Sequence, residues 1–235
     1  MNRPKAVLFD AGHTLVFIDG DRTRAAFAEE GVEVSAEGFG AAERVARTRL
    51  TGLVREGHLG TERELWHEYF VTLFRTAGVP EDRLQAVSAR IRTLHEDQHL
   101  WTGVDPRTPE ALETLLDRGF RLAVISNADG RMEDALVRAG LRGHFEFVLD
   151  SEIVGISKPE AGIFHAATEL LEMEPAECLY VGDLYPVDFL GARGAGMQAV
   201  LLDPHDMLDY GVDRIPTVAH LPGFLDRADR SRGPS

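Results

Sequence analysis

The stretch Lys5-Ala6-Val7-Leu8-Phe9-Asp10-Ala11-Gly12-His13-Thr14-Leu15 decides the fold. Its apolar run is short and uninterrupted, which is typical of a strand buried on both faces of a parallel sheet. The run ends in Asp10, and a partly buried carboxylate is costly unless partners compensate its charge. Ligands of open α/β sheets bind at the carboxyl ends of the strands. Asp10 is therefore either a site residue or an Asp that only caps a turn.

Alternating strands and helices follow Trp101. The predicted strands cover 121–126, 145–149, 178–181 and 198–202. One predicted helix begins at Thr108-Pro109 and ends at Gly119. Three further helices are predicted over 131–139, 159–172 and 186–195. Such alternation is typical of a parallel sheet with right-handed crossovers. Together with the first strand, it predicts a doubly wound, Rossmann-like α/β core with a five-stranded parallel sheet.

The segment 20–100 has a different pattern, with helical periodicity and no predicted strand. Helices are expected over 22–31 and 35–56, and an apolar stripe from Trp66 to Ala77 predicts another. A further helix is marked by apolar residues between Leu84 and Leu94. We therefore expect a core domain formed by 1–18 and 101–226, an inserted α-helical domain over 19–100, and a disordered tail over 227–235.

Composition excludes several classes of partner. The 235 residues suffice for a core and a smaller inserted domain. The net charge of −14 argues against nucleic acid or an anionic membrane as a partner. No apolar segment reaches membrane-spanning length, and the first residues lack the apolar core of a signal peptide. The sequence thus predicts a cytoplasmic protein and leaves its oligomeric state open.

Polar residues suited to chemistry stand at the ends of three predicted strands. These are Asp10, Ser126-Asn127 and Gly182-Asp183, and Lys158 precedes a proline that starts a helix. Each has an ordinary alternative: Ser126 can be a helix cap, Lys158 a solvated charge, and Asp183 a turn former. In this order on a doubly wound sheet, however, they indicate one site at a shared edge.

These residues resemble the motifs of the haloacid dehalogenase-like superfamily, most of whose members are phosphatases. The four motifs stand here as Asp10-Ala11-Gly12-His13-Thr14, Leu122-Ala123-Val124-Ile125-Ser126-Asn127, Ser157-Lys158-Pro159-Glu160, and Gly182-Asp183-Leu184-Tyr185-Pro186-Val187-Asp188. They lie between residue 5 and about residue 203, and the helical insertion resembles the family's C1-type cap. The resemblance implies a hydrolase with a Rossmann-like core and a cap domain.

The resemblance also implies roles for individual residues. Asp10 would be the nucleophile that forms an aspartyl-phosphate, which divides one difficult displacement into two easier steps. Asp10, Asp183 and the backbone carbonyl of Gly12 would hold Mg²⁺, with support from Asp188. The phosphoryl group of a small phosphorylated molecule would be bound by Ala11, Ser126, Asn127 and Lys158.

The first motif departs from the family pattern at Gly12, where the family carries the Asp that acts as general acid and base. A positioned acid or base contributes about 10²- to 10⁴-fold in rate. One interpretation is a Mg²⁺-dependent phosphatase whose substrate has a good leaving group or whose proton comes from elsewhere. His13 has a suitable ordinary pKa for that role, but a histidine that merely lies in a turn or on the surface is the favoured explanation.

Two other interpretations remain open. The chain can be a hydrolase of a bond other than a phosphoester, because dehalogenases and phosphonate hydrolases of the superfamily also lack that Asp. Dehalogenases, however, lack the intact fourth motif, and phosphonate hydrolases use a cap lysine, whereas residues 20–100 contain no lysine. The last interpretation is a regulatory module that binds phosphate with little turnover.

A second motif competes with this interpretation. His95-Glu96-Asp97-Gln98-His99 matches the His-Glu-x-x-His pattern of zinc proteases on a predicted helix. That helix is expected to end by Trp101-Thr102-Gly103, and the sequence offers no clear third ligand. In a chain with nine histidines the match is easily a coincidence.

Overall fold

The computed structural model describes residues 3–56, 62–204, 206 and 209–231. The chain divides into two compact units, Met1–Phe17 with Val104–Ser235, and Ile18–Gly103. A two-stranded sheet of β2 (Phe17–Ile18) and β3 (Trp101–Gly103) lies where the chain passes between them. Within the described ranges, no helix combines the length and apolar character needed to cross a bilayer.

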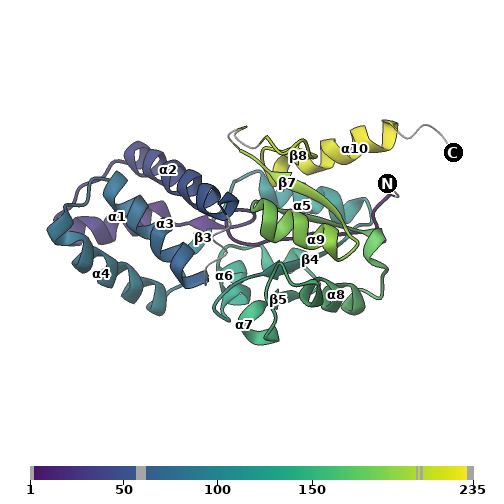
Figure 1. Ribbon diagram of the computed structural model, residues 1–235, viewed down its shortest axis with the longest axis horizontal. Coiled ribbons are helices and arrows are strands. Elements are labelled where there is room, and N and C mark those ends of the chain that lie inside the picture. Colours follow the sequence, from purple (N-terminus) through teal and green to yellow (C-terminus); the bar gives the residue numbers. More distant parts are fainter. Residues whose placement is uncertain (1–2, 57–61, 205, 207–208, 232–235) are drawn as a thin grey trace. The chain divides into compact units, whose positions relative to one another are not determined.

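The first unit is built on a parallel sheet with the strand order β5-β4-β1-β6-β7-β8. Figure 1 labels β4, β5, β7 and β8 of this sheet. The strands are β1 (Ala6–Phe9), β4 (Arg121–Ser126), β5 (Val148–Asp150), β6 (Cys178–Gly182), β7 (Gln198–Leu202) and β8 (Arg214–Ile215). The doubly wound α/β core is confirmed, but the predicted number of five strands is wrong. The sixth strand, β8, has two residues, too few to produce an apolar run in the sequence.

Helices accompany the strands of this unit (Figure 1). They are α5 (Thr108–Asp117), α6 (Met132–Arg138), α7 (Ser151–Val154), α8 (Ala161–Leu170), α9 (Leu190–Gly194) and α10 (Leu221–Ser231). Two predictions need correction. The strand predicted over 145–149 covers Val148–Asp150 instead, and a 3₁₀ turn, Arg142–His144, precedes it. Helix 186–195 is split, because Tyr185–Phe189 forms a π-helical turn before α9.

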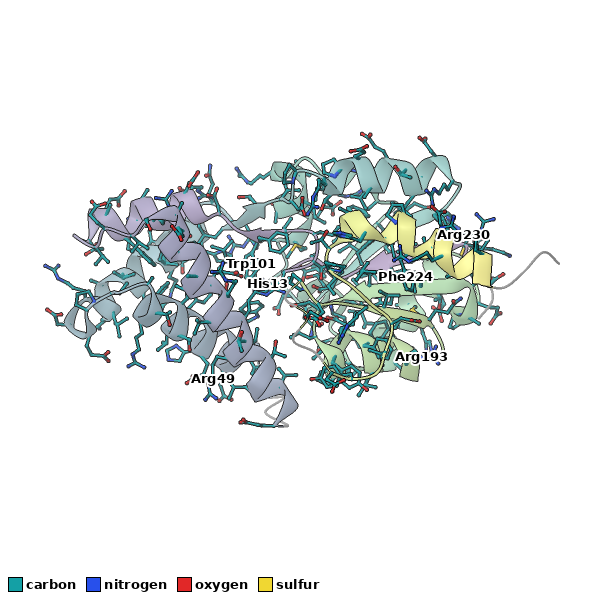
Figure 2. The ribbon with its side chains drawn as sticks, turned by 90° about the horizontal axis from the view of Figure 1, so that it is seen from above. His13, Arg49, Trp101, Arg193, Phe224 and Arg230 are labelled. Atoms are coloured by element: carbon teal, nitrogen blue, oxygen red, sulfur yellow. The ribbon has the colours of Figure 1, made fainter. Side chains whose placement is uncertain are left out.

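The predicted disordered tail, 227–235, is wrong over 227–231, which belong to α10. Residues 232–235 lie outside the described residues. Figure 2 shows α10 beside the strands of its unit, with Phe224 and Arg230 on it. Leu221 and Leu225 are buried, and the guanidinium of Arg118, the residue after α5, donates to the Asp226 carboxylate at 2.8 Å. These contacts order a segment whose polar composition alone favoured fraying.

One core cluster of the first unit lies on the face of the sheet that α8 covers. Residues 6 and 8 of β1, with Ile125 and Tyr180, pack against Ile163, Phe164 and Ala167 of α8. All four residues of β1 are fully buried, as the uninterrupted apolar run predicted. Burying each large apolar side chain stabilises the fold by about 1.5–3 kcal/mol. The strand that carries Asp10 is thus held rigidly on both faces.

The second unit is helical. It contains α1 (Gly20–Glu29), α2 (Ala36–Arg55), α3 (Glu62–Thr76) and α4 (Leu84–Asp97). Asp19 and Ser35 cap α1 and α2, and each side chain accepts a backbone N–H of the first turn. The expected stripe on α3 is confirmed as core, since Tyr69, Leu73 and Phe74 are buried. Trp66 of this stripe contacts Trp101 with ring centroids 5.1 Å apart.

Candidate active site

The carboxyl ends of β1, β4 and β6 lie level with one another. Phe9 pairs in register with Val124 of β4 and with Val181 of β6. Asp10 follows directly, and its backbone N–H donates to the Val181 carbonyl at 2.9 Å. The strands after β1 continue first to one side of it and then to the other. The strand order therefore reverses at this edge, which is where open α/β sheets bind ligands.

Lys158 enters this edge from the segment before α8. Its side chain is only 2% exposed. The Nζ donates to Oδ1 of Asp10 at 2.6 Å and to Oδ1 of Asp188 at 2.8 Å. It also donates to the Tyr180 hydroxyl at 3.0 Å. Because an ammonium has three N–H donors, these three acceptors fix its direction.

Asp188 connects Lys158 to the loop that carries Asp183. Its second carboxylate oxygen, Oδ2, accepts the backbone N–H of Asp183 at 3.1 Å and that of Leu184 at 2.9 Å. The approach of Asp188 requires Gly182, because a Cβ at that position would lie 2.5 Å from the Asp188 Cγ. The Gly-Asp-x-x-x-x-Asp spacing thus has a local reason: the second Asp folds back onto the first three residues of the motif.

Burial and charge act against each other in this cluster. Burial raises the pKa of Asp10 to about 6 even though the Lys158 ammonium lowers it. Burial acts to lower the pKa of Lys158, but the Asp10 and Asp188 carboxylates outweigh it and hold that pKa well above its ordinary value. Near neutral pH, Asp10 is therefore mostly ionised and Lys158 is fully charged.

Three carboxylates of this edge form a donor set for a cation. One oxygen each of Asp10, Asp183 and Asp188 lies within 4.8 Å of the others. Carboxylate oxygens are the ligands that Mg²⁺ prefers. Lys158 neutralises only one of the three formal negative charges. The donor chemistry and the remaining negative charge both fit a divalent cation.

Comparison with known proteins identifies the family to which these residues belong. A family model described as haloacid dehalogenase-like hydrolase matches residues 4–196. The chain belongs to the haloacid dehalogenase-like hydrolases. The four motifs predicted from the sequence lie within the matched range.

Individual relatives and a solved structure are consistent with this family. Haloacid dehalogenase-like hydrolase domain-containing protein 3 of Mus musculus is 36% identical over 181 residues, which are 73% of this chain and 71% of that protein. Glyceraldehyde 3-phosphate phosphatase of Methanothermobacter thermautotrophicus is 30% identical over 200 residues, 85% of each chain. The crystal structure of the HAD-hydrolase YfnB from Bacillus subtilis, bound to magnesium, matches with a TM-score of 0.70 at 20% identity. That match covers 96% of this chain and 100% of YfnB, and it shows the shared fold.

Within this haloacid dehalogenase-like framework, Asn127 contacts Lys158 at the main chain. Its Nδ2 donates to the Lys158 carbonyl at 3.0 Å, and its Oδ1 accepts the Lys158 N–H at 2.8 Å. Ser126 is buried at the end of β4, one residue before Asn127. The second motif and the lysine segment are thus joined directly. These contacts hold the lysine segment in place, whereas the family resemblance implied that Asn127 binds the phosphoryl group.

Sequence reasoning missed two residues of this framework. The Asp150 carboxylate accepts the backbone N–H groups of Gly130, Met132 and Glu152 at 3.0–3.2 Å, so it holds the loop that follows Ser126. A carboxylate at the end of β5 was a possible signal, but the strand was predicted to end one residue earlier. Tyr180 was missed because an aromatic residue inside a buried strand normally indicates core.

The turn after Asp10 is closed by main-chain bonds. The Ala11 carbonyl accepts the N–H groups of Leu15 and Val16 at 2.8 and 2.9 Å. Gly12 is half-buried. Because a glycine has no side chain, the haloacid dehalogenase-like motif has no carboxylate at this point. His13 is buried with φ of 55°, and its ring meets the Phe17 ring edge to face with centroids 6.4 Å apart. Figure 2 labels it.

The His-Glu-x-x-His match does not lie on one helix. Helix α4 ends at Asp97, so His95 is helical and His99 is not. The Nδ1 of His95 accepts the Leu100 N–H, and the Nδ1 of His99 accepts the Trp101 N–H, both at 3.3 Å. The imidazoles therefore contact the main chain at the end of the helix, and the helical-face spacing of the zinc proteases is absent from this segment.

Proposed function

We propose that the chain is a Mg²⁺-dependent phosphatase that acts on a small phosphorylated molecule through Asp10. The observation that supports this most strongly is the cluster of Asp10, Lys158, Asp183 and Asp188 at the reversal point of the sheet. Relatives named as phosphatases support the same reaction class. We also propose that the helical unit acts as the cap that selects the substrate, and that the protein is cytoplasmic.

The reaction begins with attack of the Asp10 carboxylate on phosphorus. A bond forms between a carboxylate oxygen and phosphorus, and the bond from phosphorus to the leaving oxygen breaks with its electron pair on that oxygen. Water then attacks the phosphorus of the aspartyl-phosphate, releasing inorganic phosphate and regenerating Asp10. Lys158 stabilises negative charge on the phosphoryl oxygens, with Ser126 and Ala11 at the same edge, and positioning of this kind supplies most of the catalysis in phosphoryl transfer.

Mg²⁺ would be held by Asp10, Asp183 and the Gly12 carbonyl. When bound, it would supply positive charge that stabilises the transferred phosphoryl group. Asp188 would support the site indirectly, because both of its oxygens already accept hydrogen bonds from Lys158 and the Asp183 loop. Binding of the divalent cation can be measured separately from activity, through the melting temperature. Mg²⁺ should raise the melting temperature of the wild type, and Asp183→Asn should abolish that rise.

The test of the proposed function is hydrolysis of acetyl phosphate and of an aryl phosphate, with Mg²⁺ and with EDTA. We expect activity only with Mg²⁺ and a fall of at least about a thousandfold in Asp10→Asn. Asp134→Asn, which changes an exposed carboxylate of α6, is the matched control and should keep wild-type activity. Unchanged activity in Asp10→Asn would end the nucleophile assignment. Phosphate binding without turnover would favour the regulatory module instead.

The glycine at position 12 narrows the class of phosphate ester that we expect as substrate. Without a carboxylate at this position, esters with good leaving groups should react best, because they need little protonation of the leaving oxygen. Gly12→Asp should therefore raise the ratio of alkyl phosphate to aryl phosphate hydrolysis. An unchanged ratio, with activity retained, would contradict this account of the missing acid.

A further inference from the structure

Among the three acceptors that the structure describes around the Lys158 Nζ, Tyr180 is the one to which the motifs assign no function. It lies on β6, fully buried, and its ring meets the Phe164 ring edge to face with centroids 5.2 Å apart. Ordinary core tyrosines place an apolar ring inside and a polar tip near water. This hydroxyl instead points into the charged cluster. Its surroundings are therefore those of a site residue on a core strand.

The hydroxyl both donates and accepts. It donates to the Ile125 carbonyl of β4 at 3.0 Å, and it accepts from the Lys158 Nζ at 3.0 Å. The Asp188 Oδ1, at 3.5 Å, is a more distant second acceptor. A phenol has a single proton. The nearer acceptor, the Ile125 carbonyl, takes that proton, so the oxygen lone pairs are available to the ammonium. Tyr180 thus connects Lys158 to the residue just before Ser126.

The other two partners of Lys158 are carboxylates. In the proposed reaction, Asp10 forms a bond to phosphorus and loses its negative charge, so its hold on Lys158 weakens. Tyr180 is neutral and takes no part in bond formation, and its hydroxyl is hydrogen-bonded to β4. A neutral acceptor also leaves the ammonium charge less compensated than a third carboxylate would, so more of that charge remains for the phosphoryl oxygens.

We propose that Tyr180 is a positioning residue, whose hydroxyl holds the Lys158 ammonium at the carboxyl end of β4 throughout the reaction. This inference rests on the proposed phosphatase function. The simpler alternative is that the hydroxyl only satisfies the buried Ile125 carbonyl. The two differ in one respect: a positioning residue acts through Lys158, whereas a partner of Ile125 alone does not.

The experiment compares wild type, Tyr180→Phe and Tyr69→Phe with an aryl phosphate and Mg²⁺, well below each melting temperature. Tyr69 is the matched control, a buried tyrosine of the helical unit whose hydroxyl contacts Glu43 at 3.4 Å. We expect kcat to fall about tenfold to a hundredfold in Tyr180→Phe, the range for a hydrogen bond to a charged group. We expect less than about a twofold change in KM, and wild-type kcat in Tyr69→Phe. A kcat in Tyr180→Phe within about twofold of wild type would overturn the proposal.

A double-mutant cycle with Lys158→Gln separates the alternatives. Tyr180→Phe should change the residual kcat less than about twofold in the Lys158→Gln background. An equal loss in both backgrounds would assign the hydroxyl to Ile125 alone. Asp10→Asn in the same assay reports on the proposed function separately, because unchanged activity there would reject the nucleophile whatever Tyr180→Phe shows.

A direct readout without substrate uses the ¹H–¹⁵N signal of the Lys158 ammonium. A buried, fully hydrogen-bonded ammonium exchanges slowly with water. We expect this signal in the wild type and in Tyr69→Phe, and its loss or a large shift in Tyr180→Phe. An unchanged signal in Tyr180→Phe would overturn the proposal even if the cycle variants fail to fold.

Discussion

The two ends of the parallel sheet carry the same kinds of charged residue in opposite settings. At the amino end, Lys5 pairs with Glu177 at 2.5 Å, and Arg121 pairs with Glu146. At the carboxyl end, Lys158 pairs with Asp10 and Asp188. The Lys5 side chain is 65% exposed, and that of Lys158 is 2% exposed.

The difference shows that the contribution of an ion pair to stability depends on how far the pair is buried. Exposed pairs are screened by water and salt, and they typically contribute up to about 1 kcal/mol. A buried pair loses hydration on both partners and needs further hydrogen bonds to offset that loss. The amino end therefore tolerates change, whereas the carboxyl end is an organised cluster in which each group depends on the others. The four predictions below test this contrast, from the largest expected effect to the smallest.

Removing the buried ammonium should have the largest effect. Lys158→Met leaves Asp10 and Asp188 buried without their cation, so we expect a loss of about 3–5 kcal/mol in the free energy of unfolding together with loss of activity. Lys5→Met makes the same chemical change at the exposed end and should cost less than about 1 kcal/mol. Urea denaturation in EDTA measures both. Equal losses in the free energy of unfolding for the two variants would contradict the contrast between the buried and the exposed end.

Acidification should affect the two ends in opposite directions. Burial raises the pKa of Asp10 from 3.8 to about 6, so its stabilising contribution is present below pH 3.8 and is lost as the pH rises through 6. The Arg121 hydrogen bond lowers the pKa of Glu146 below 4.5, so its contribution is present above 4.5 and is lost as the pH falls.

The corresponding experiment is urea denaturation in EDTA between about pH 4 and pH 7. The stability of wild type relative to Asp10→Asn should fall by on the order of 2–3 kcal/mol across this range. The stability of wild type relative to Glu146→Gln should rise slightly instead. If both differences move in the same direction with pH, the assignment of opposite shifts is incorrect.

A methyl group at Gly182 should disturb the buried cluster by contact alone. A Cβ there would lie 2.5 Å from Asp188 Cγ, so Gly182→Ala should cost about 1–3 kcal/mol and reduce activity as Asp188 shifts. Gly194 of α9 is the control, because the described atoms leave open space around a Cβ at that position. Gly194→Ala should leave stability equal or slightly higher. Wild-type activity in Gly182→Ala would show that Asp188 need not hold its observed position.

The smallest effect is expected at the Arg121–Glu146 pair. Both side chains are more than a third exposed, so Glu146→Gln should cost at most about 1 kcal/mol, fading in 1 M NaCl. Denaturation at low and high salt measures this. A cost that survives high salt would mean that the pair is less solvated than its exposure indicates.

Local pattern predicted much of this molecule. The apolar run before Asp10 gave β1, and periodicity gave most of the helices of both units, although α7 and α10 were not predicted. The edge on which Asp10, Ser126 and Asp183 lie followed from strand order, because the carboxyl ends of parallel strands share one edge. Prediction failed where the pattern was too short or contradicted by packing. Strand β8 has two residues, and the polar end of α10 is ordered by contacts with α5.

Prediction of the site stopped where contacts join residues distant in the sequence. The spacing of the fourth motif gave the Asp183–Asp188 loop, since its bonds span only four or five residues. The Lys158 ammonium, in contrast, meets Asp10 across 148 positions and Tyr180 across 22. No local pattern encodes that a strand tyrosine turns its hydroxyl to an ammonium.

The sequence by itself determined which chemical groups stand at the ends of the strands, and hence the family and the class of reaction to test. Only the tertiary structure decided which of those groups share a proton or a charge, how deeply each is buried, and that Tyr180 joins them. The physical reason is that propensity and hydrophobic period act over a few neighbouring residues. The pKa of Asp10 and the direction of the Lys158 ammonium depend on burial and on partners that only the folded chain brings together.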